Sequence, residues 1–529
     1  MGFSGLPDMT GKMGNLPIET ETFGLLDRPL SHMIGFCLGI YALYYLSNAI
    51  YLIYFAPLSK FPGPKLWAAS RIPWAHHVIK GDLWDVLEEF HERYGPVVRI
   101  APDEITTISP TSWKDIYVSR PVLPKDPYSQ TPPLNGAHSL FTAAGDTHKR
   151  IRSTLINGFS DKALRDQAPI MEYYVDQLVA RLRREANKTV DGAVNIQKFY
   201  GYAAFDMVTD LSLGESFRGL EDSNEHSWIL GFFFHAKYGT IRNCLSRFSP
   251  LDIFLGLILL GVTRKNRLRN WKIVTEKIEK RLAKGDARSD FMTPVIGSIN
   301  EGAQKGITKA EVITNYLAFV IADCQLTTVA LSASTYLLLR DPQKLNELVE
   351  EVRGAFERED QITVQSTQSL VYLDAVINET MRIHHPTPIS LPRLVPAGGR
   401  TIDGEFIPGN TVIGINLQNI QNSPSLWVEP RVFHPERFLP SNDPRYDPRF
   451  DKDNKAAFVP FSTGPRNCLG GRVFMAQARV ILAKVFWNFD LTMVGKQEDW
   501  LDQKAYLVFE PKPLPVTLRQ RLSLEKQLN

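Results

Sequence analysis

One short segment near the end of the chain limits the possible folds of this 529-residue protein more than any other. It runs from Phe461 to Gly470 and contains Cys468, one of four cysteines in the sequence. Gly464 and Gly470 let the backbone bend close to the sulfur, so that amide N–H groups can point at a thiolate. Arg466 supplies a fixed cation suited to a carboxylate, and the Phe461 ring offers an apolar cover for the sulfur. The segment therefore predicts a thiolate held in a structured loop.

This segment resembles the cofactor-binding loop of the cytochrome P450 superfamily, and it fills each diagnostic position of that loop. The resemblance implies that Cys468 is the axial thiolate ligand of the iron in haem b, iron protoporphyrin IX. Phe461, Arg466 and Gly470 are then cofactor-binding residues. A thiolate ligand pushes electron density onto the iron and favours cleavage of the O–O bond. The alternative is an inert buried cysteine, which is the usual fate of a lone cysteine but leaves the complete loop unexplained.

Two further segments resemble the parts of the family that hold the two propionate groups of haem. His148 and Arg152 are four residues apart in a predicted helix and therefore share one face. Arg393 occupies the place of another propionate-binding arginine. Together with Arg466, these side chains are expected to neutralise two carboxylates that would otherwise be costly to bury. For each arginine taken alone, a solvated surface charge is the competing interpretation.

A third similarity concerns a structural lock rather than the reaction. Glu379 and Arg382 lie three residues apart on a helix predicted to begin near Leu373, so the two side chains share a face. Such pairs are common, but here the segment Phe433–Phe438 follows at a suitable distance. The resemblance implies that Arg437 joins the pair in one buried network. Removing one partner would leave a buried charge, at a cost of about 3–5 kcal/mol.

The predicted helix from Ala310 to Leu339 departs from the family pattern. An alignment without gaps places Asp323 at the position of a glycine, Gln325 at that of an acid, and Leu326 at that of a threonine. The family's acid–threonine pair organises protons for dioxygen, whereas glutamine does not titrate and leucine forms no hydrogen bond. A local π-bulge would bring Thr327 into the place of the lost threonine; otherwise the proton route is altered. Asp323 and Thr327 share a face of the helix in either case.

The resemblance implies a haem-thiolate monooxygenase that inserts one atom of O2 into a lipophilic small molecule. The altered helix keeps a second interpretation open, in which the enzyme catalyses desaturation, rearrangement or dehydration. A non-catalytic haem sensor or membrane scaffold is a third, and the full set of cofactor-binding motifs disfavours it. Residues 391–404 and 500–504 resemble microsomal enzymes of filamentous fungi. We therefore expect a terpenoid, polyketide or alkaloid intermediate of secondary metabolism as the substrate.

Charge and motifs also limit the partners. Sixty basic and 57 acidic residues give a net charge of +3, which argues against nucleic-acid binding. The four cysteines show no paired spacing, so a disulfide scaffold is excluded and a reducing compartment fits. A dinucleotide-binding G-x-G-x-x-G motif is absent from the sequence, so electrons are expected from NADPH through a separate membrane-bound cytochrome reductase. Lys149, Arg150 and Arg472 are candidates for its basic docking surface. Cytochrome b5 is a possible further partner.

The segment Met33–Ala56 has no charged residue and predicts a transmembrane helix. Its length as a helix, about 36 Å, is enough to cross a bilayer, and it is too long for a cleaved signal peptide. The basic residues that follow it are Lys60, Lys65, Arg71 and Lys80. The positive-inside rule therefore predicts a single-pass protein of the endoplasmic reticulum membrane, in contact with lipid. Residues 1–32 are expected in the lumen and residues 57–529 in the cytosol.

Residues 57–529 show no linker or repeat and predict one mainly α domain with a small β region. Strands are expected at Val97–Ile100 and Glu104–Ser109, and a hairpin is expected to turn at Asp403-Gly404. The family resemblance implies the cytochrome P450 fold, an α+β fold in which helices form a triangular prism around haem. The apolar stretch Ser249–Val262 is too short to span a bilayer, so it is either a membrane-side substrate entrance or a buried helix.

Overall fold

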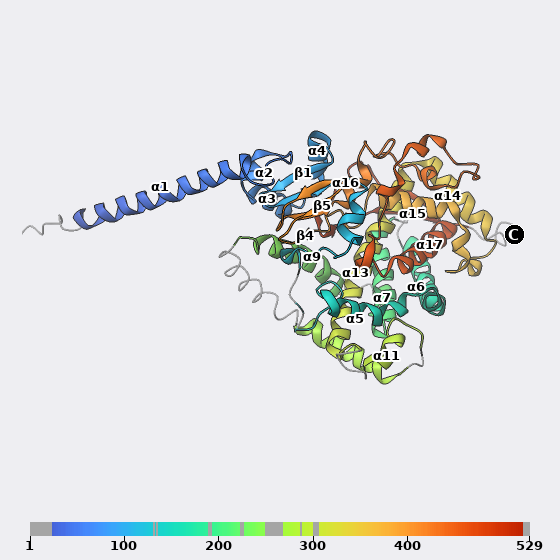
Figure 1. Ribbon diagram of the computed structural model, residues 1–529. Coiled ribbons are helices and arrows are strands. Elements are labelled where there is room, and N and C mark those ends of the chain that lie inside the picture. Colours follow the sequence, from blue (N-terminus) through green and yellow to red (C-terminus); the bar gives the residue numbers. More distant parts are fainter. Residues whose placement is uncertain are drawn as a thin grey trace, which may run out of the picture.

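The computed structural model describes residues 24–130, 133, 136–188, 193–222, 227–248, 268–285, 288–299 and 306–521. The apolar stretch 249–262, expected to be either a substrate entrance or a buried helix, and most of the predicted N-terminal tail lie outside these residues. Helices dominate, and the strands form small sheets (Figure 1). The expected mainly α fold with a small β region is therefore confirmed.

The first helix, α1 (Gly24–Tyr54), extends away from the rest of the chain (Figure 1). It begins before the predicted start at Met33, because the apolar stretch that suits a bilayer is shorter than the segment that favours a helix. Its part Ser31–Tyr54 has a mean hydropathy of 1.5 and is not buried against the protein. By length and composition this part is able to cross a membrane.

The remaining helices carry most of the fold. They are α2 (Lys65–Ala69), α3 (Ile72–Lys80), α4 (Leu83–Tyr94), α5 (Gly145–Leu155), α6 (Asp161–Ala186), α7 (Ile196–Leu213), α8 (Gly219–Asp222), α9 (Ser227–Leu245), α11 (Thr293–Ile299), α13 (Lys309–Arg340), α14 (Pro342–Ala355), α15 (Val371–Ile383), α16 (Leu417–Asn422) and α17 (Gly471–Asn488). Short 3-10 segments connect several of them, and the predicted helix at 113–118 is a π-helix, Lys114–Val118.

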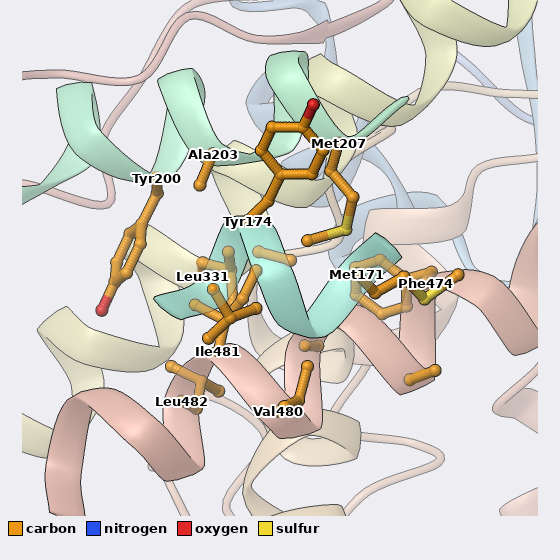
Figure 2. Close-up of a cluster of buried hydrophobic side chains, with 14 of the residues drawn as sticks. Met171, Tyr174, Tyr200, Ala203, Met207, Leu331, Phe474, Val480, Ile481 and Leu482 are labelled. Carbon is orange, nitrogen blue, oxygen red and sulfur yellow. The ribbon is translucent and has the colours of Figure 1, made fainter. Parts of the chain in front are cut away.

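The long helix α13 runs through the core. A capping box begins it, because Thr308 and Glu311 satisfy each other's backbone amides. Although α13 is apolar enough to resemble a membrane span, 61% of its most apolar window is buried in the protein. Figure 2 shows Leu331 of α13 among side chains from α6, α7 and α17, such as Met171, Met207 and Ile481. This packing places α13 beside the helix that follows Cys468.

In the part of the chain that the structure describes, the strands form four small sheets. A four-stranded sheet has the order β1 (Val97–Ala101), β2 (Glu104–Thr107), β7 (Val412–Ile415) and β4 (Arg393–Leu394), with β2 and β7 parallel. The hairpin β5 (Arg400–Ile402) and β6 (Glu405–Ile407) turns at Asp403-Gly404, as predicted. The other sheets combine β3 (Ala193–Asn195), β11 (Pro515–Gln520) and β8 (Phe489–Met493), and β9 (Ala505–Tyr506) with β10 (Val508–Phe509). The first sheet brings Arg393 of β4 into the interior.

Candidate functional site

Cys468 lies in a loop between a 3-10 turn, Gly464–Arg466, and the start of α17. Its backbone N–H donates to the Phe461 carbonyl oxygen at 2.9 Å, which closes the loop. Gly464 has a φ of +79°, and a Cβ there would lie 2.2 Å from the carbonyl oxygen of Tyr117. The loop therefore needs glycine at this position both for its backbone conformation and for close packing.

The surroundings of the Cys468 sulfur oppose and favour its ionisation at once. The side chain is accessible, yet burial in the surrounding protein raises the pKa of the thiol. The amide N–H groups of Gly470 and Gly471 donate to the sulfur, and together with Arg152 they lower the pKa. Two backbone amides thus point at a sulfur that is accessible. A bound metal ion would complete the ionisation, because a coordinating thiol loses its proton.

Five basic side chains converge beside this loop. They are Lys125, His148, Arg152, Arg393 and Arg466. Burial and the charges of the arginines and Lys125 lower the pKa of His148 to about 4. Burial, Arg393 and Arg152 also lower the pKa of Arg466. Across the ranges that the structure describes, none of the five forms an ion pair with a carboxylate. The cluster therefore has positive charge without a matching anion.

The four predicted propionate-binding residues differ in what they contact. Arg152 donates to the backbone oxygen of Asn467 at 2.9 Å and to its Oδ1 at 2.5 Å, so it braces the cysteine loop. Arg466 donates to the Ala143 oxygen at 3.0 Å, while its Nη1 is buried without a hydrogen-bond partner. The Nε of Arg393 is likewise buried without one. Such atoms are costly unless a ligand satisfies them.

Tyr117 supports this cluster and was missed by the sequence analysis. Its ring lies under the Arg393 guanidinium, 5.0 Å from ring centroid to Cζ. Its hydroxyl donates to the Leu391 oxygen at 2.9 Å and accepts from the Ile415 amide at 3.0 Å. Burial raises the pKa of Tyr117 to about 12, so it stays neutral. The contact depends on the π-helix packing against the loop of Gly464, which sequence spacing does not indicate.

On the α13 side, the structure brings Asp323 and Thr327 together with Gln477 of α17. Thr327 Oγ1 lies 3.5 Å from Asp323 Oδ1 and 3.4 Å from Gln477 Oε1. Gln477 Nε2 donates to Asp323 Oδ2 at 3.3 Å. Burial raises the pKa of Asp323 to about 7, and the two hydrogen bonds act against that rise. Gln477 was also missed, although its place on the helix after Cys468 is visible in the sequence.

The other predicted residue on α13, Gln325, does not join this group. It is buried, and its Nε2 has no hydrogen-bond partner. Regular α-helix continues through Lys309–Arg340, so no π-bulge moves Thr327 into the threonine position. The sequence left two alternatives open, a π-bulge that shifts Thr327 or an altered proton route. The structure agrees with the second, and its acid, Asp323, lies two residues before the family's usual acid position.

The residues of the predicted lock meet near the C-terminal end of α15. Arg382 donates to both Glu379 oxygens at 2.7 Å, and Arg437 Nε lies 3.0 Å from Glu379 Oε2. Arg437 also pairs with Asp453 at 2.5 Å. All four side chains are inaccessible to solvent. The network fixes the segment that leads into the cysteine loop.

The three residues expected on a basic docking surface are not equivalent. Arg150 is turned inward, where it pairs with Glu311 at 2.6 Å and donates to the Gly306 oxygen. Lys149 and Arg472 are exposed, and each pairs with a nearby aspartate, Asp146 and Asp161 respectively. Arg150 therefore does not belong to that surface; it ties α5 to the start of α13.

These features fit haem b. Cys468 would hold the iron, because it supplies a sulfur with amides directed at it. The two carboxylates of haem need cations, and the basic cluster supplies them together with the unsatisfied Arg393 Nε and Arg466 Nη1.

Comparisons with known proteins agree with this site. The sequence model of the family "Cytochrome P450" matches residues 61–518. "Cytochrome P450 monooxygenase lcsI" of Purpureocillium lilacinum is 34% identical over 92% of this chain and 94% of its own length. An averantin hydroxylase of Dothistroma septosporum is 36% identical over 92% of this chain and 91% of its own length. A versicolorin B desaturase of the same fungus is 34% identical over 91% of this chain and 92% of its own length. The chain belongs to the cytochrome P450 family, is an oxidoreductase of its monooxygenase class, and by that membership is implied to bind haem.

Proposed function

We propose that the chain inserts one oxygen atom from O2 into a lipophilic intermediate of fungal secondary metabolism. The other oxygen atom leaves as water, and NADPH supplies two electrons through a separate reductase. Haem b with a thiolate ligand supplies the activation of O2 and the cleavage of its O–O bond when it is bound. The observation that carries the proposal is the accessible Cys468 sulfur, at which two backbone amides point, close to basic side chains that lack an anion.

In this proposal each side chain has a separate task. Cys468 ligates the iron, and Phe461 and Gly470 shape the loop around it. His148, Arg393 and Arg466 hold the carboxylates, while Arg152 braces the loop through Asn467. Glu379, Arg382 and Arg437 keep the supporting segment in place. The lock residues are buried and take no part in the chemistry.

Proton supply falls to Asp323 in this chain. Its pKa of about 7 leaves the carboxyl partly protonated at neutral pH, which suits a general acid. Gln477 and Thr327 orient the carboxyl, and the Thr327 hydroxyl is placed to pass a proton on. Gln325 lies in the usual acid position but contacts no member of this group. Asp323 thus replaces the family's usual acid as proton donor, from a position two residues earlier on α13.

Desaturation of the substrate is the second candidate reaction. Two observations favour it: a related protein is a versicolorin B desaturase, and the usual acid–threonine pair is absent from α13. A desaturation still consumes O2 and two external electrons, but both oxygen atoms leave as water. The substrate of either reaction is proposed to be a terpenoid, polyketide or alkaloid intermediate.

The membrane setting is also part of the proposal. Helix α1 would anchor the chain in the endoplasmic reticulum membrane, with the folded body in the cytosol near the reductase and cytochrome b5. A lipophilic substrate would then reach the enzyme from the bilayer. Lys149 and Arg472 are exposed, and an acidic partner would compete with Asp146 and Asp161 for them.

Isotope labelling tests the reaction class. The purified chain, a reductase, NADPH and ¹⁸O2 are incubated with candidate intermediates, and the products are analysed by mass spectrometry. One labelled oxygen atom in the product supports the monooxygenation. Loss of two hydrogens without label identifies the desaturase instead, and an isomer without label and without O2 consumption contradicts both.

A further inference from the structure

His385 lies in the turn that follows α15, the helix of the lock, and its side chain is buried. Its backbone N–H donates to Gln418 Oε1 of α16 at 2.9 Å. Gln418 also donates to the oxygen of Ile383, the last residue of α15, so α16 is tied to both sides of the turn. The buried ion pair of Glu379 and Arg382 fixes the helix before it. The imidazole of His385 therefore extends from a backbone that is held in place.

Both ring nitrogens of His385 contact backbone atoms. Nε2 lies 3.0 Å from the Pro460 oxygen, and Nδ1 lies 2.9 Å from the oxygen and 3.1 Å from the nitrogen of Thr387. A carbonyl oxygen only accepts, so Nε2 carries a hydrogen and donates to Pro460. In the neutral ring Nδ1 accepts from the Thr387 N–H, and in the charged ring it donates to the Thr387 oxygen. The contact with Pro460 is the same in both forms.

Pro460 lies in the turn that leads into the cysteine loop. Ser462, two residues later, has a φ of +57°, a left-handed conformation that residues other than glycine rarely adopt. Phe461, between the two, supplies the carbonyl oxygen that accepts the Cys468 N–H and closes the loop. A strained backbone of this kind persists only where surrounding contacts hold it. A hydrogen bond at Pro460 therefore acts next to the residue that closes the loop and close to the strained one.

We infer that His385 is a positioning residue for the thiolate. Its Nε2–H holds the Pro460 carbonyl and, through Phe461, keeps the loop in the shape in which backbone amides point at the Cys468 sulfur. The inference rests on the proposed function, since it assumes that this sulfur binds the haem iron. Hydrogen bonds to a ligating sulfur withdraw charge from it and tune the potential of the metal. His385 thus affects the iron through the backbone of the loop.

Two amide variants of the haem-loaded protein test this role. The amide nitrogen of glutamine reaches the place of Nε2 in histidine, whereas that of asparagine reaches only the place of Nδ1. In mild denaturant, His385→Asn is expected to lose the red-shifted carbon monoxide band about two to ten times faster than wild type, as for loss of one hydrogen bond. A redox titration should show a more negative iron potential, because misaligned amides withdraw less charge from the sulfur. His385→Gln should restore both quantities toward wild type.

The matched control is His384→Asn, because His384 is the preceding residue and is also buried, with its ring stacked on Phe509 at 3.9 Å between centroids. It should lower the melting temperature and leave the potential and the rate of band loss unchanged.

Equal rates and potentials in His385→Asn and wild type would overturn the inference. So would changes that His385→Gln does not reverse, or an equal shift of potential in His384→Asn, since either result means a packing role. If His385→Asn does not take up haem, His385→Gln decides: wild-type values support the inference, and altered values overturn it. Absence of the red-shifted band in wild type refutes the proposed function, whereas a normal wild-type band leaves only the role of His385 to be decided.

Discussion

The two sides of the proposed haem site differ in how closely they follow the family pattern. On the cysteine side, the loop, its glycines and the arginine before it agree with the pattern, and the structure explains why. Gly464 has no room for a side chain, and amides of Gly470 and Gly471 must reach the sulfur. On the α13 side, the acid and threonine are absent, and Asp323 lies where glycine is usual.

This difference separates two kinds of constraint. Holding a thiolate on iron requires one backbone shape, so few residues are tolerated there. Supplying a proton requires only a carboxyl within reach, and more than one position along a helix provides it. The side that faces the substrate therefore has more freedom to change. Asp323, fixed by Gln477 from the cysteine's own helix, is one such solution.

The largest expected effect tests the cysteine side. Cys468→Ala should abolish the red-shifted Soret band of the reduced protein with carbon monoxide, together with all turnover, because the axial ligand is removed. Absorption spectra of purified protein measure this directly. Cys244→Ala is the matched control, since Cys244 is buried and distant in sequence, with its sulfur at the Ala75 oxygen. A normal band in Cys468→Ala would refute the ligand assignment.

The next effect tests the altered side. Asp323→Asn and Thr327→Ala should each lower product formed per NADPH and raise hydrogen peroxide, with a loss of about 10²–10⁴-fold in product formation. Gln325→Ala should leave the ratio of product to NADPH unchanged, because Gln325 Nε2 has no hydrogen-bond partner. Peroxide and product are measured against NADPH consumed. An unchanged ratio of product to NADPH in Asp323→Asn, or a lower ratio only in Gln325→Ala, would show that Asp323 is not the proton donor.

A third prediction concerns the support of the cysteine side. Glu379→Gln should destabilise the fold by about 3–5 kcal/mol, since it leaves Arg382 and Arg437 buried with less negative charge. Glu405→Gln breaks an exposed pair with Lys60 and should cost about 1 kcal/mol or less. Thermal unfolding and the yield of haem-loaded protein measure both. Similar losses of stability in the two variants would show that the buried network stabilises the fold no more than an exposed ion pair does.

The smallest effect is a pH dependence on the altered side. Burial raises the pKa of Asp323 to about 7 from its ordinary value of 3.8, so the folded protein binds a proton that the unfolded chain has lost. Its contribution to stability is complete below pH 3.8 and is lost as the pH rises through about 7. The melting temperature of Asp323→Asn relative to wild type should therefore increase between pH 5.5 and pH 8. A difference that does not change with pH would contradict the raised pKa.

Local signals in the sequence predicted much of this molecule. The loop of Cys468, the helix carrying Glu379 and the hairpin at Asp403-Gly404 each depend on residues close together in the chain. Contacts between distant segments were not predictable in the same way. Lys125 meets Arg393 only through strand pairing, and Gln477 meets Asp323 only through the packing of two helices. The suggested π-bulge was wrong, because regular α-helix continues through Lys309–Arg340.

The buried residue Arg99 gives α1 a consequence of its own. Its guanidinium donates to the Leu52 oxygen of α1 at 2.7 Å and to the Pro102 oxygen at 2.8 Å, and Gly63 packs on its backbone. The C-terminal turn of α1 is therefore fixed to the folded body and not joined to it by a flexible linker. If α1 crosses a bilayer, as proposed above, this contact limits the height and the tilt of the folded body above the membrane. Partners that diffuse in the same membrane would then meet it face-on at a fixed level, and their search would be reduced to two dimensions and one angle of rotation.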